Sequence, residues 1–359
     1  MTTRPAADPT AADPTAGPTA DASADVRPTH PVTLPANQPP ERFYRGGARI
    51  AEFRGEPVTS ERVPEDWVGS TTTLFGEPTL GLSPLPRGDL LADAVAADPV
   101  HWLGAEHVAA SGPDTALLVK LLDAGERLPV HAHPDVPFAG EHLGLAHGKT
   151  EAWIALADAD VHLAFARDVT ADELDRWVAT QDTAAMLGAM HRLHVRTGDA
   201  VLVPAGLPHA IGAGAFVVEL QEPTDLSILL EWDGFAIDGP RDGHLGLGHA
   251  TALRAVDRRG WSSDEVAGLV QADASTVGSL LPGGAAFFRA DRVRGDDRWE
   301  PSFAVVVVTA GTGTLVAADG TRTPLRAGAT LVVPHAAGSL DVVAGADLEL
   351  VRCRPPLPA

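Results

Sequence analysis

The chain has 359 residues, of which 45% are hydrophobic, and this length suffices for two compact domains with buried cores. Its 48 acidic residues outnumber its 27 basic residues, so the formal net charge is -21, which disfavours binding to nucleic acid or to an anionic membrane. One cysteine, Cys353, cannot form an intrachain disulfide, and no apolar run approaches the roughly 20 residues of a membrane-spanning helix. We therefore expect a soluble cytoplasmic protein.

The N-terminal part differs in composition from the rest of the chain. Residues 1–40 are rich in Ala, Asp, Pro and Thr, and the sequence Ala-Asp-Pro-Thr-Ala occurs at both 7–11 and 12–16. Such a segment buries too little apolar surface to offset the entropy lost on ordering, so we expect a disordered tail. Ordered structure is expected to begin near Arg42, and helical spacing of apolar residues predicts a helix over 92–102.

The middle of the chain alternates short apolar runs with turn residues. This pattern is typical of antiparallel β-structure, and the expected strands are 116–121, 128–133, 151–156, 161–166, 200–203, 210–219 and 226–231. Residues 170–193 instead have helical spacing, with Thr170 as the expected N-cap and Glu173 completing a capping box. His191 and His194 then lie near the end of this helix, where a partly positive side chain is favoured without any ligand role.

Two histidine motifs lie on either side of the predicted helix. A Gly-x5-His-x-His run ends in His131 and His133, and a Gly-x5-Pro-x-Gly-x2-His run ends in His209. Because residues i and i+2 of a strand point to the same face, His131 and His133 can aim their imidazoles into one cavity. With Glu151 as a fourth ligand, this donor set suits one divalent metal, Zn, with Mn, Fe, Co or Ni as alternatives.

In this order and at this spacing, the two motifs resemble the double motif of the cupin superfamily, whose small barrels hold a metal through these positions. The resemblance implies a mostly β fold of two cupin (jelly-roll) barrels with inserted helices, the first barrel carrying the metal site. A later segment, 328–334, repeats the Gly-x5-Pro half of the motif, but Ser339 stands where the histidine is expected. The second barrel is therefore expected to hold no metal.

The expected domains follow from this pattern. They are a tail over 1–40, a metal-binding catalytic cupin domain over 41–260 with a helical insertion near 170–193, and a helical connection with a metal-free cupin domain over 261–359. The connection contains two candidate helices, at 248–257 and 262–271, and the second β-rich run extends from about 285 to 353.

From about Glu65 to the C-terminus, the sequence resembles the type I mannose-6-phosphate isomerases. The matching stretches are 117–123, 133–135, 148–153, 204–210 and 218–225. The resemblance implies a zinc-dependent enzyme of carbohydrate metabolism that interconverts mannose 6-phosphate and fructose 6-phosphate through a cis-enediol. Carried over by position, the metal ligands are His131, His133, Glu151 and His209.

The expected reaction also needs a group that moves a proton between two sugar carbons, within hydrogen-bond reach of the substrate. The candidates are Lys149, Glu219 and Asp225. The structural alternative for Lys149 is pairing with Glu151 or Asp135, and that for the two carboxylates is ordering of the barrel mouth. Expected substrate-binding residues are Lys120, on the strand before the metal motif, Trp67, near the entrance, and Arg127.

The sequence departs from this family at two positions. Leu229 stands where relatives carry an arginine assigned to substrate handling, and Pro129 stands where they tend to have a serine tied to the substrate phosphate. Losing a guanidinium that grips phosphate bidentately is a large chemical change; Arg127 or Arg241 are the alternatives from other parts of the chain. An isomerase or epimerase of an unphosphorylated sugar, and a non-catalytic sugar-binding cupin, therefore remain alternatives.

Overall fold

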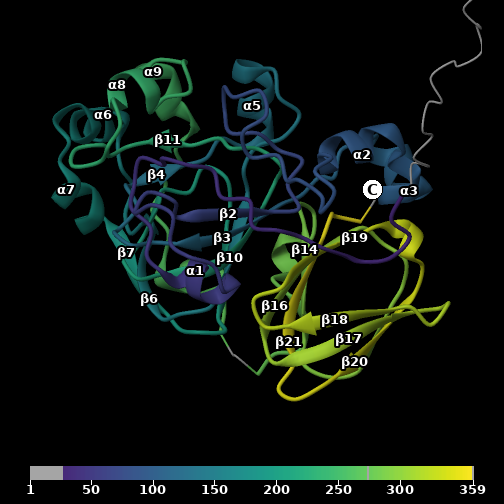
Figure 1. Ribbon diagram of the computed structural model, residues 1–359. Coiled ribbons are helices and arrows are strands. Elements are labelled where there is room, and N and C mark those ends of the chain that lie inside the picture. Colours follow the sequence, from purple (N-terminus) through teal and green to yellow (C-terminus); the bar gives the residue numbers. More distant parts are fainter. Residues whose placement is uncertain (1–26, 273–274, 358–359) are drawn as a thin grey trace, which may run out of the picture.

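The computed structural model describes residues 27–272 and 275–357. Figure 1 shows two groups of antiparallel strands lying side by side, with short helices mainly at the outer edges. Among the described residues, no helix combines the length and apolar character that crossing a bilayer requires. The expectation of a mostly β protein is confirmed.

The first group of strands forms two sheets. The central sheet has the order β12-β8-β5-β10-β3-β2, with bounds Val270–Gln271, Ala200–Val203, Glu151–Ala155, Phe216–Gln221, Leu118–Asp123 and Glu65–Val68. The histidine sheet has the order β11-β4-β9-β6-β7, with bounds Ile228–Leu229, His131–Ala132, His209–Ile211, Ala159–Phe165 and Met190–Val195.

The second group also forms two sheets. The C-terminal six-stranded sheet has the order β1-β19-β16-β21-β14-β13, with bounds Val32–Thr33, Thr330–Val333, Ala304–Ala310, Glu349–Arg354, Arg289–Val293 and Gly278–Leu280. The C-terminal four-stranded sheet has the order β15-β20-β17-β18, with bounds Asp297–Trp299, Leu340–Ala344, Thr312–Ala317 and Arg322–Arg326.

The four sheets are layers that share apolar cores. Alternate residues of a strand face opposite sides; Val305 and Val307 of β16 pack against the central sheet, whereas Val306 packs toward the four-stranded sheet. Trp153 and Leu163 belong to a further core between the central and histidine sheets. Apolar cores thus cover both faces of the central sheet, and this packing fixes the positions of the strands that carry the site.

Short helices cover the outer parts of the sheets. Those of the N-terminal half are α1 Arg49–Arg54, α2 Leu91–Ala97, α3 Pro99–Leu103, α4 Ala105–Ser111, α5 Val136–Leu143, α6 Ala171–Thr180 and α7 Thr183–Gly188. The later ones are α8 Gly239–Asp242, α9 His249–Ala252, α10 Ser263–Ala267 and the 3-10 turns Leu253–Ala255, Pro282–Gly284 and His335–Ala337. Helices α6 and α7 pack on the outer face of the histidine sheet.

The predicted helix over 170–193 is correct only in its first part. Helices α6 and α7 end at Gly188, and β7 then begins at Met190 and pairs with β6, so His191 and His194 lie on a strand and the expectation that they end a helix is wrong. Thr170 is the N-cap, accepting from the Glu173 amide, but the Glu173 carboxylate instead accepts from Arg167. The side chain of Ser262 does form a complete capping box with Glu265 in α10.

Two other boundaries differ because local turns break long patterns. The predicted helix 92–102 is divided into α2 and α3 at Pro99, whose ring prevents a continuous helix. The predicted strand 210–219 is β9 followed by β10, with Gly214 at positive φ in the turn between them.

The expected tail over 1–40 needs correction in its described part, 27–40, whereas 1–26 lie outside the described residues. Strand β1 pairs with β19, Leu34 is buried, and the Asn37 side chain donates to the carbonyl oxygens of Trp67 and Gly81 at 3.1 and 2.8 Å. These contacts are made with distant parts of the chain, which composition alone does not reveal.

Candidate metal centre

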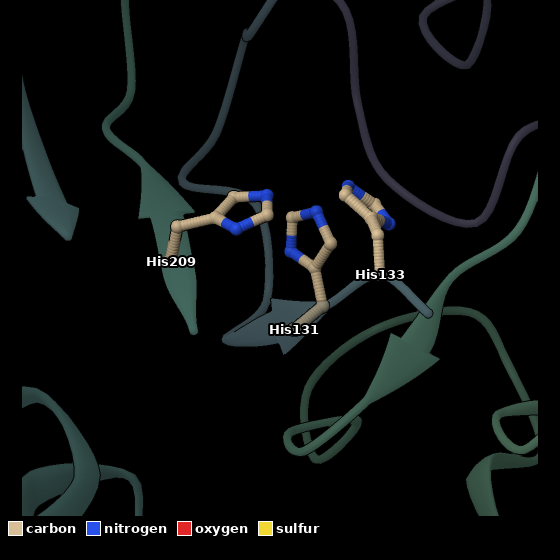
Figure 2. Close-up of side chains that lie close together, drawn as sticks. All are labelled: His131, His133 and His209. Carbon is tan, nitrogen blue, oxygen red and sulfur yellow. The ribbon is translucent and has the colours of Figure 1, made fainter. Parts of the chain in front are cut away.

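Three buried histidines lie close together between the histidine sheet and the central sheet. His131 of β4 lies directly opposite His209 of β9, and His133 follows β4 by one residue. Their ring centroids are 4.1 to 4.9 Å apart, and one nitrogen from each lies within 4.8 Å of the others. Figure 2 shows the three rings turned toward a common space.

The backbone fixes which nitrogen of each ring is available. In all three, Nδ1 contacts a carbonyl oxygen at 2.6 to 2.9 Å; the acceptors for His131, His133 and His209 are Pro129, Leu226 and Leu207. Because a carbonyl oxygen only accepts, Nδ1 must carry the proton, and the Nε2 lone pairs are left for other partners. A hydrogen bond of this kind orients the ring of a metal-binding histidine.

Glu151 approaches the histidines from the opposite sheet. Its carboxylate oxygens lie 3.0 Å from Nε2 of His133 and 3.4 Å from Nε2 of His209. Nε2 of His209 is buried and has no hydrogen-bond partner among the described residues, which is costly unless a ligand takes its lone pair. Three imidazole nitrogens and one carboxylate therefore fit a divalent metal ion.

The protonation states favour the same ligand. Burial, reinforced for His133 by the Lys149 ammonium, lowers the pKa of His131 and lowers that of His133 to about 3. Both rings are thus neutral at pH 7, the form that binds metal. Burial raises the pKa of Glu151, but Lys149 and His133 outweigh it and hold the pKa well below its ordinary value, so this carboxylate is ionised.

The central sheet places a second set of functional side chains in one row. Trp67 of β2 lies opposite Lys120 of β3, Lys120 opposite Glu219 of β10, and Glu219 opposite Trp153 of β5. Residues paired in this way share a face of the sheet, and Glu151, two residues before Trp153, lies on the same face. These side chains of the central sheet therefore face the three histidines of the opposite sheet.

Oppositely charged groups alternate from the metal centre along this face. Lys149 Nζ lies 3.0 Å from Glu151 and 3.8 Å from Glu219, and Lys120 Nζ lies 3.8 Å from Glu219 and 3.7 Å from Asp225. Lys120 also lies 3.7 Å from Glu65 and 4.5 Å above the Trp67 ring. The two ammonium groups are thus each held by carboxylates.

Glu219 differs from its neighbours in its protonation. Burial first, and the nearby Glu151 carboxylate second, raise its pKa to about 7, against the opposing effect of Lys120 and Lys149. Asp225 has a lowered pKa because Arg42 and Lys120 outweigh its burial, and the pKa of Lys149 is raised because carboxylates outweigh its burial. Glu219 is therefore the candidate whose proton is exchanged most easily near neutral pH.

These groups line a cavity of about 230 Å³. His131, Glu151, Lys149, Glu219 and Lys120 contribute to its polar wall, as do Arg42, Glu65, Asp225 and Asp242. Leu229 and Pro129 also line it, together with Phe75, Leu128, Ile211 and Leu245. A small polar molecule in this space would contact the metal centre and the charged row together.

Two expected substrate contacts require correction. Trp67 is fully buried, and its Nε1 donates to Glu65 at 2.6 Å; it lies behind Lys120 and is not an entrance residue. Arg127 lies outside the cavity lining, where its guanidinium is bound by Glu231, with Nη1 2.7 Å from Oε2.

Among the cavity-lining residues that the sequence did not predict, Arg42 carries a positive charge. Arg42 lines the cavity from the segment before β2, with Nε 3.2 Å from Glu65 and Nη2 3.8 Å from Asp225. The sequence around Arg42 has no motif that points to the metal centre, so only the fold reveals its position.

Solved structures show which class of fold this is. A point mutant of the phosphomannose isomerase of Salmonella typhimurium superposes with a TM-score of 0.70 at 15% identity, covering 91% of this chain and 100% of that one. The mannose 6-phosphate isomerase of Bacillus subtilis superposes with a TM-score of 0.68 at 22% identity, covering 90% and 99%. The chain has the phosphomannose isomerase fold.

Curated sequences agree with this fold. The chain is 32% identical over 186 residues to the mannose-6-phosphate isomerase of Streptococcus mutans, covering 50% of this chain and 54% of that protein. It is 31% identical over 201 residues to a probable mannose-6-phosphate isomerase of Bacillus subtilis, covering 55% and 59%. These alignments span little more than half of the relatives, and no protein-family model matches the chain. The resemblance expected from the sequence is confirmed.

Proposed function

We propose that the protein is a metal-dependent aldose-ketose isomerase that interconverts mannose 6-phosphate and fructose 6-phosphate through a cis-enediol. The observation that carries this proposal is the meeting of three Nε2 lone pairs and the Glu151 carboxylate at the wall of a cavity that also contains Glu219 and Lys149. The names of the relatives support the substrate.

The ligands in this proposal are His131, His133, His209 and Glu151, and the resident metal is zinc. A divalent metal held there supplies a Lewis acid that polarises the carbonyl and hydroxyl oxygens of the substrate. Lys149, 3.0 Å from Glu151 and 3.2 Å from Nε2 of His133, orients the carboxylate and places a further hydrogen-bond donor beside the reacting oxygens.

Glu219 is the proposed proton carrier. Its carboxylate takes the proton from C2 of the aldose, while a hydroxyl proton moves between O2 and O1, and the proton is then returned to C1 to give the ketose. Lys120 and Lys149 flank Glu219 at 3.8 Å and stabilise its ionised form, whereas Asp225 holds Lys120 in place. Atoms and charges balance without any co-reactant.

The finer architecture belongs to the same proposal. The central and histidine sheets without β12 are interpreted as the first cupin barrel, within 41–260, and the two C-terminal sheets without β1 as the second, within 261–359. Strand β12, at Val270–Gln271, pairs with β8 of the central sheet, so residues past 260 also add a strand to the first barrel. A cytoplasmic location, expected from cysteine content, remains a prediction.

The test is turnover by the purified chain loaded with zinc. Mannose 6-phosphate and free mannose are supplied in parallel, and formation of fructose 6-phosphate or fructose is measured. Formation of fructose 6-phosphate that is abolished by a chelator and restored by zinc supports the proposal. Metal-loaded protein that converts neither sugar contradicts it and favours a sugar-binding cupin.

The second candidate function is isomerisation of an unphosphorylated sugar. It is favoured by the apolar side chains of Leu229 and Pro129 in the cavity wall, because neither side chain can form an ion pair with a phosphate. In the test above, turnover of free mannose that exceeds turnover of mannose 6-phosphate supports this second candidate.

The role of Leu229 leads to a prediction. Leu229 lies opposite His131 in the β4–β11 pair, so Leu229→Arg brings a guanidinium into the cavity. Because a bidentate contact with phosphate stabilises binding, we expect KM for mannose 6-phosphate to fall by roughly tenfold, with little change for free mannose. Leu229→Met is the matched control of similar volume. An unchanged KM in Leu229→Arg contradicts the prediction and means that the introduced guanidinium does not contact the phosphate.

A further inference from the structure

The proposed substrate carries a phosphate, yet the arginine position of relatives is occupied by Leu229. The cavity must then provide another cation if that phosphate is bound. Three cationic side chains line it, namely Arg42, Lys120 and Lys149.

The two lysines are already surrounded by carboxylates. Lys149 lies 3.0 Å from Glu151 and also contacts Glu219, and Lys120 has three carboxylates within 3.8 Å. Lys120 is also 2% exposed and Lys149 5% exposed. Lys120 therefore has one more carboxylate neighbour than Arg42, which contacts Glu65 and Asp225, and Lys149 lies beside the metal centre itself.

Arg42 is anchored but keeps one edge of its guanidinium available. Its backbone amide donates to the Arg62 carbonyl at 2.9 Å, and its Nε donates to Glu65 at 3.2 Å. No residue in 27–272 or 275–357 accepts a hydrogen bond from Nη1 or Nη2, although Nη2 forms an ion pair with the Asp225 carboxylate at 3.8 Å. The paired Nη donors are thus held in place within the cavity lining.

The order of charged contacts also places Arg42 farther from the metal ligands along the network than either lysine. From the metal centre, the charged contacts run Glu151, Lys149, Glu219, Lys120, Asp225 and then Arg42. The reacting carbons C1 and C2 lie at one end of the sugar and the phosphate at the other. Arg42 stands at the end of this series away from the metal ligands.

The arginines named from the sequence lie elsewhere. Arg127 is bound through both Nη atoms by Glu231. The Arg241 side chain is 72% exposed and is paired with Asp242 and Asp238. Neither guanidinium lines the cavity.

We propose that Arg42 binds the phosphate of the substrate through Nη1 and Nη2. The inference rests on the proposed function for the identity of the sugar. A planar guanidinium whose Nε is fixed by Glu65 needs little further ordering to bind two phosphate oxygens. Arg42 thereby determines the preference for phosphorylated over free sugar.

The test compares Arg42→Gln and Arg42→Lys with Arg298→Gln, an exposed control whose side chain is 64% exposed and pairs with Asp341. In Arg42→Gln, we expect the ratio of kcat/KM for mannose 6-phosphate to that for free mannose to fall roughly 30-fold, mainly through KM. Arg42→Lys keeps the charge but not the paired donors, so its ratio is expected to lie between that of Arg42→Gln and that of the parent protein. Arg298→Gln should leave the ratio at the parent value. A ratio unchanged in Arg42→Gln, or an equal loss on both sugars, overturns the proposal.

A binding measurement separates this proposal from the proposed function. Calorimetric titration with fructose 6-phosphate, with inorganic phosphate and with fructose uses the metal-loaded protein and needs no turnover. Weaker binding of both phosphate compounds in Arg42→Gln, with fructose unaffected, supports the role of Arg42 even if the chain isomerises neither sugar. Turnover of mannose 6-phosphate together with unchanged phosphate affinity in Arg42→Gln overturns this proposal and leaves the isomerase function intact. Equal melting temperatures and metal contents establish that the variants are folded.

Discussion

Replacing His209 with alanine is expected to reduce the bound divalent metal to less than roughly a tenth of the parent content after dialysis against metal-free buffer. His209 is fully buried, its Nδ1 is fixed by the Leu207 carbonyl, and its Nε2 has no hydrogen-bond partner among the described residues. Loss of groups that merely orient a metal ligand lowers affinity about 10- to 100-fold, and loss of a ligand itself has a larger effect. Metal content per chain, measured by elemental analysis, checks this.

The control is His194→Ala. His194 lies on β7 in the same sheet, but its side chain is 56% exposed and contacts Asp160, so its loss should leave the metal content unchanged. His209→Gln is a second variant that fills more of the buried space; comparison of the metal-free melting temperatures separates a folding defect from lost coordination. Parent-level metal in a folded His209 variant contradicts the assignment of this residue as a ligand.

The metal centre is the part of the site that the sequence predicts best. Strand alternation places the side chains of His131 and His133 on the same face of the sheet. The segment with His209 forms the neighbouring strand, which brings the third imidazole beside them. The structure brings all three together and adds Glu151 from the opposite sheet. The strand pattern and the family resemblance predict the same four residues, because each of them lies in a regular strand or directly after one.

The other parts of the site and of the fold depend on contacts between segments that are distant in the sequence, and no local pattern encodes such contacts. Arg42 reaches the cavity because its chain segment hydrogen-bonds to Arg62 and its guanidinium meets Glu65. Strand β1 exists because β19 offers it a partner. Likewise, residues 190–193 have helical apolar spacing, yet pairing with β6 makes them a strand, because tertiary packing outweighs weak intrinsic preference.

The cavity lining shows why resemblance alone is insufficient for the substrate. Lys120, Lys149, Glu219 and Asp225 occupy one connected charge network. Leu229 and Pro129 add apolar side chains to the lining of the same cavity. Phosphate binding and chemistry at the metal centre therefore call for separate variants.

Glu219→Gln is expected to lower kcat by roughly 10² to 10⁴, with little change in bound metal. The amide keeps the size of the side chain but cannot accept the substrate proton, whereas the proposed ligands His131, His133, His209 and Glu151 are retained. Asp225→Asn is the comparison, because Asp225 is the other carboxylate named for proton transfer. A large loss in Asp225→Asn together with near-parent kcat in Glu219→Gln assigns the proton transfer to Asp225 instead.

The pH dependence of kcat/KM gives an independent check on Glu219. Burial and the Glu151 carboxylate raise its pKa to about 7, and only the ionised carboxylate can take a proton from C2. Activity should therefore fall by about tenfold for each pH unit below that pKa and level off above it. The positive charge of a metal bound nearby stabilises the carboxylate, so in the loaded protein the midpoint should lie at or below pH 7. In Glu219→Gln this acidic limb should disappear from the residual activity; an identical limb in the variant means that another group titrates there.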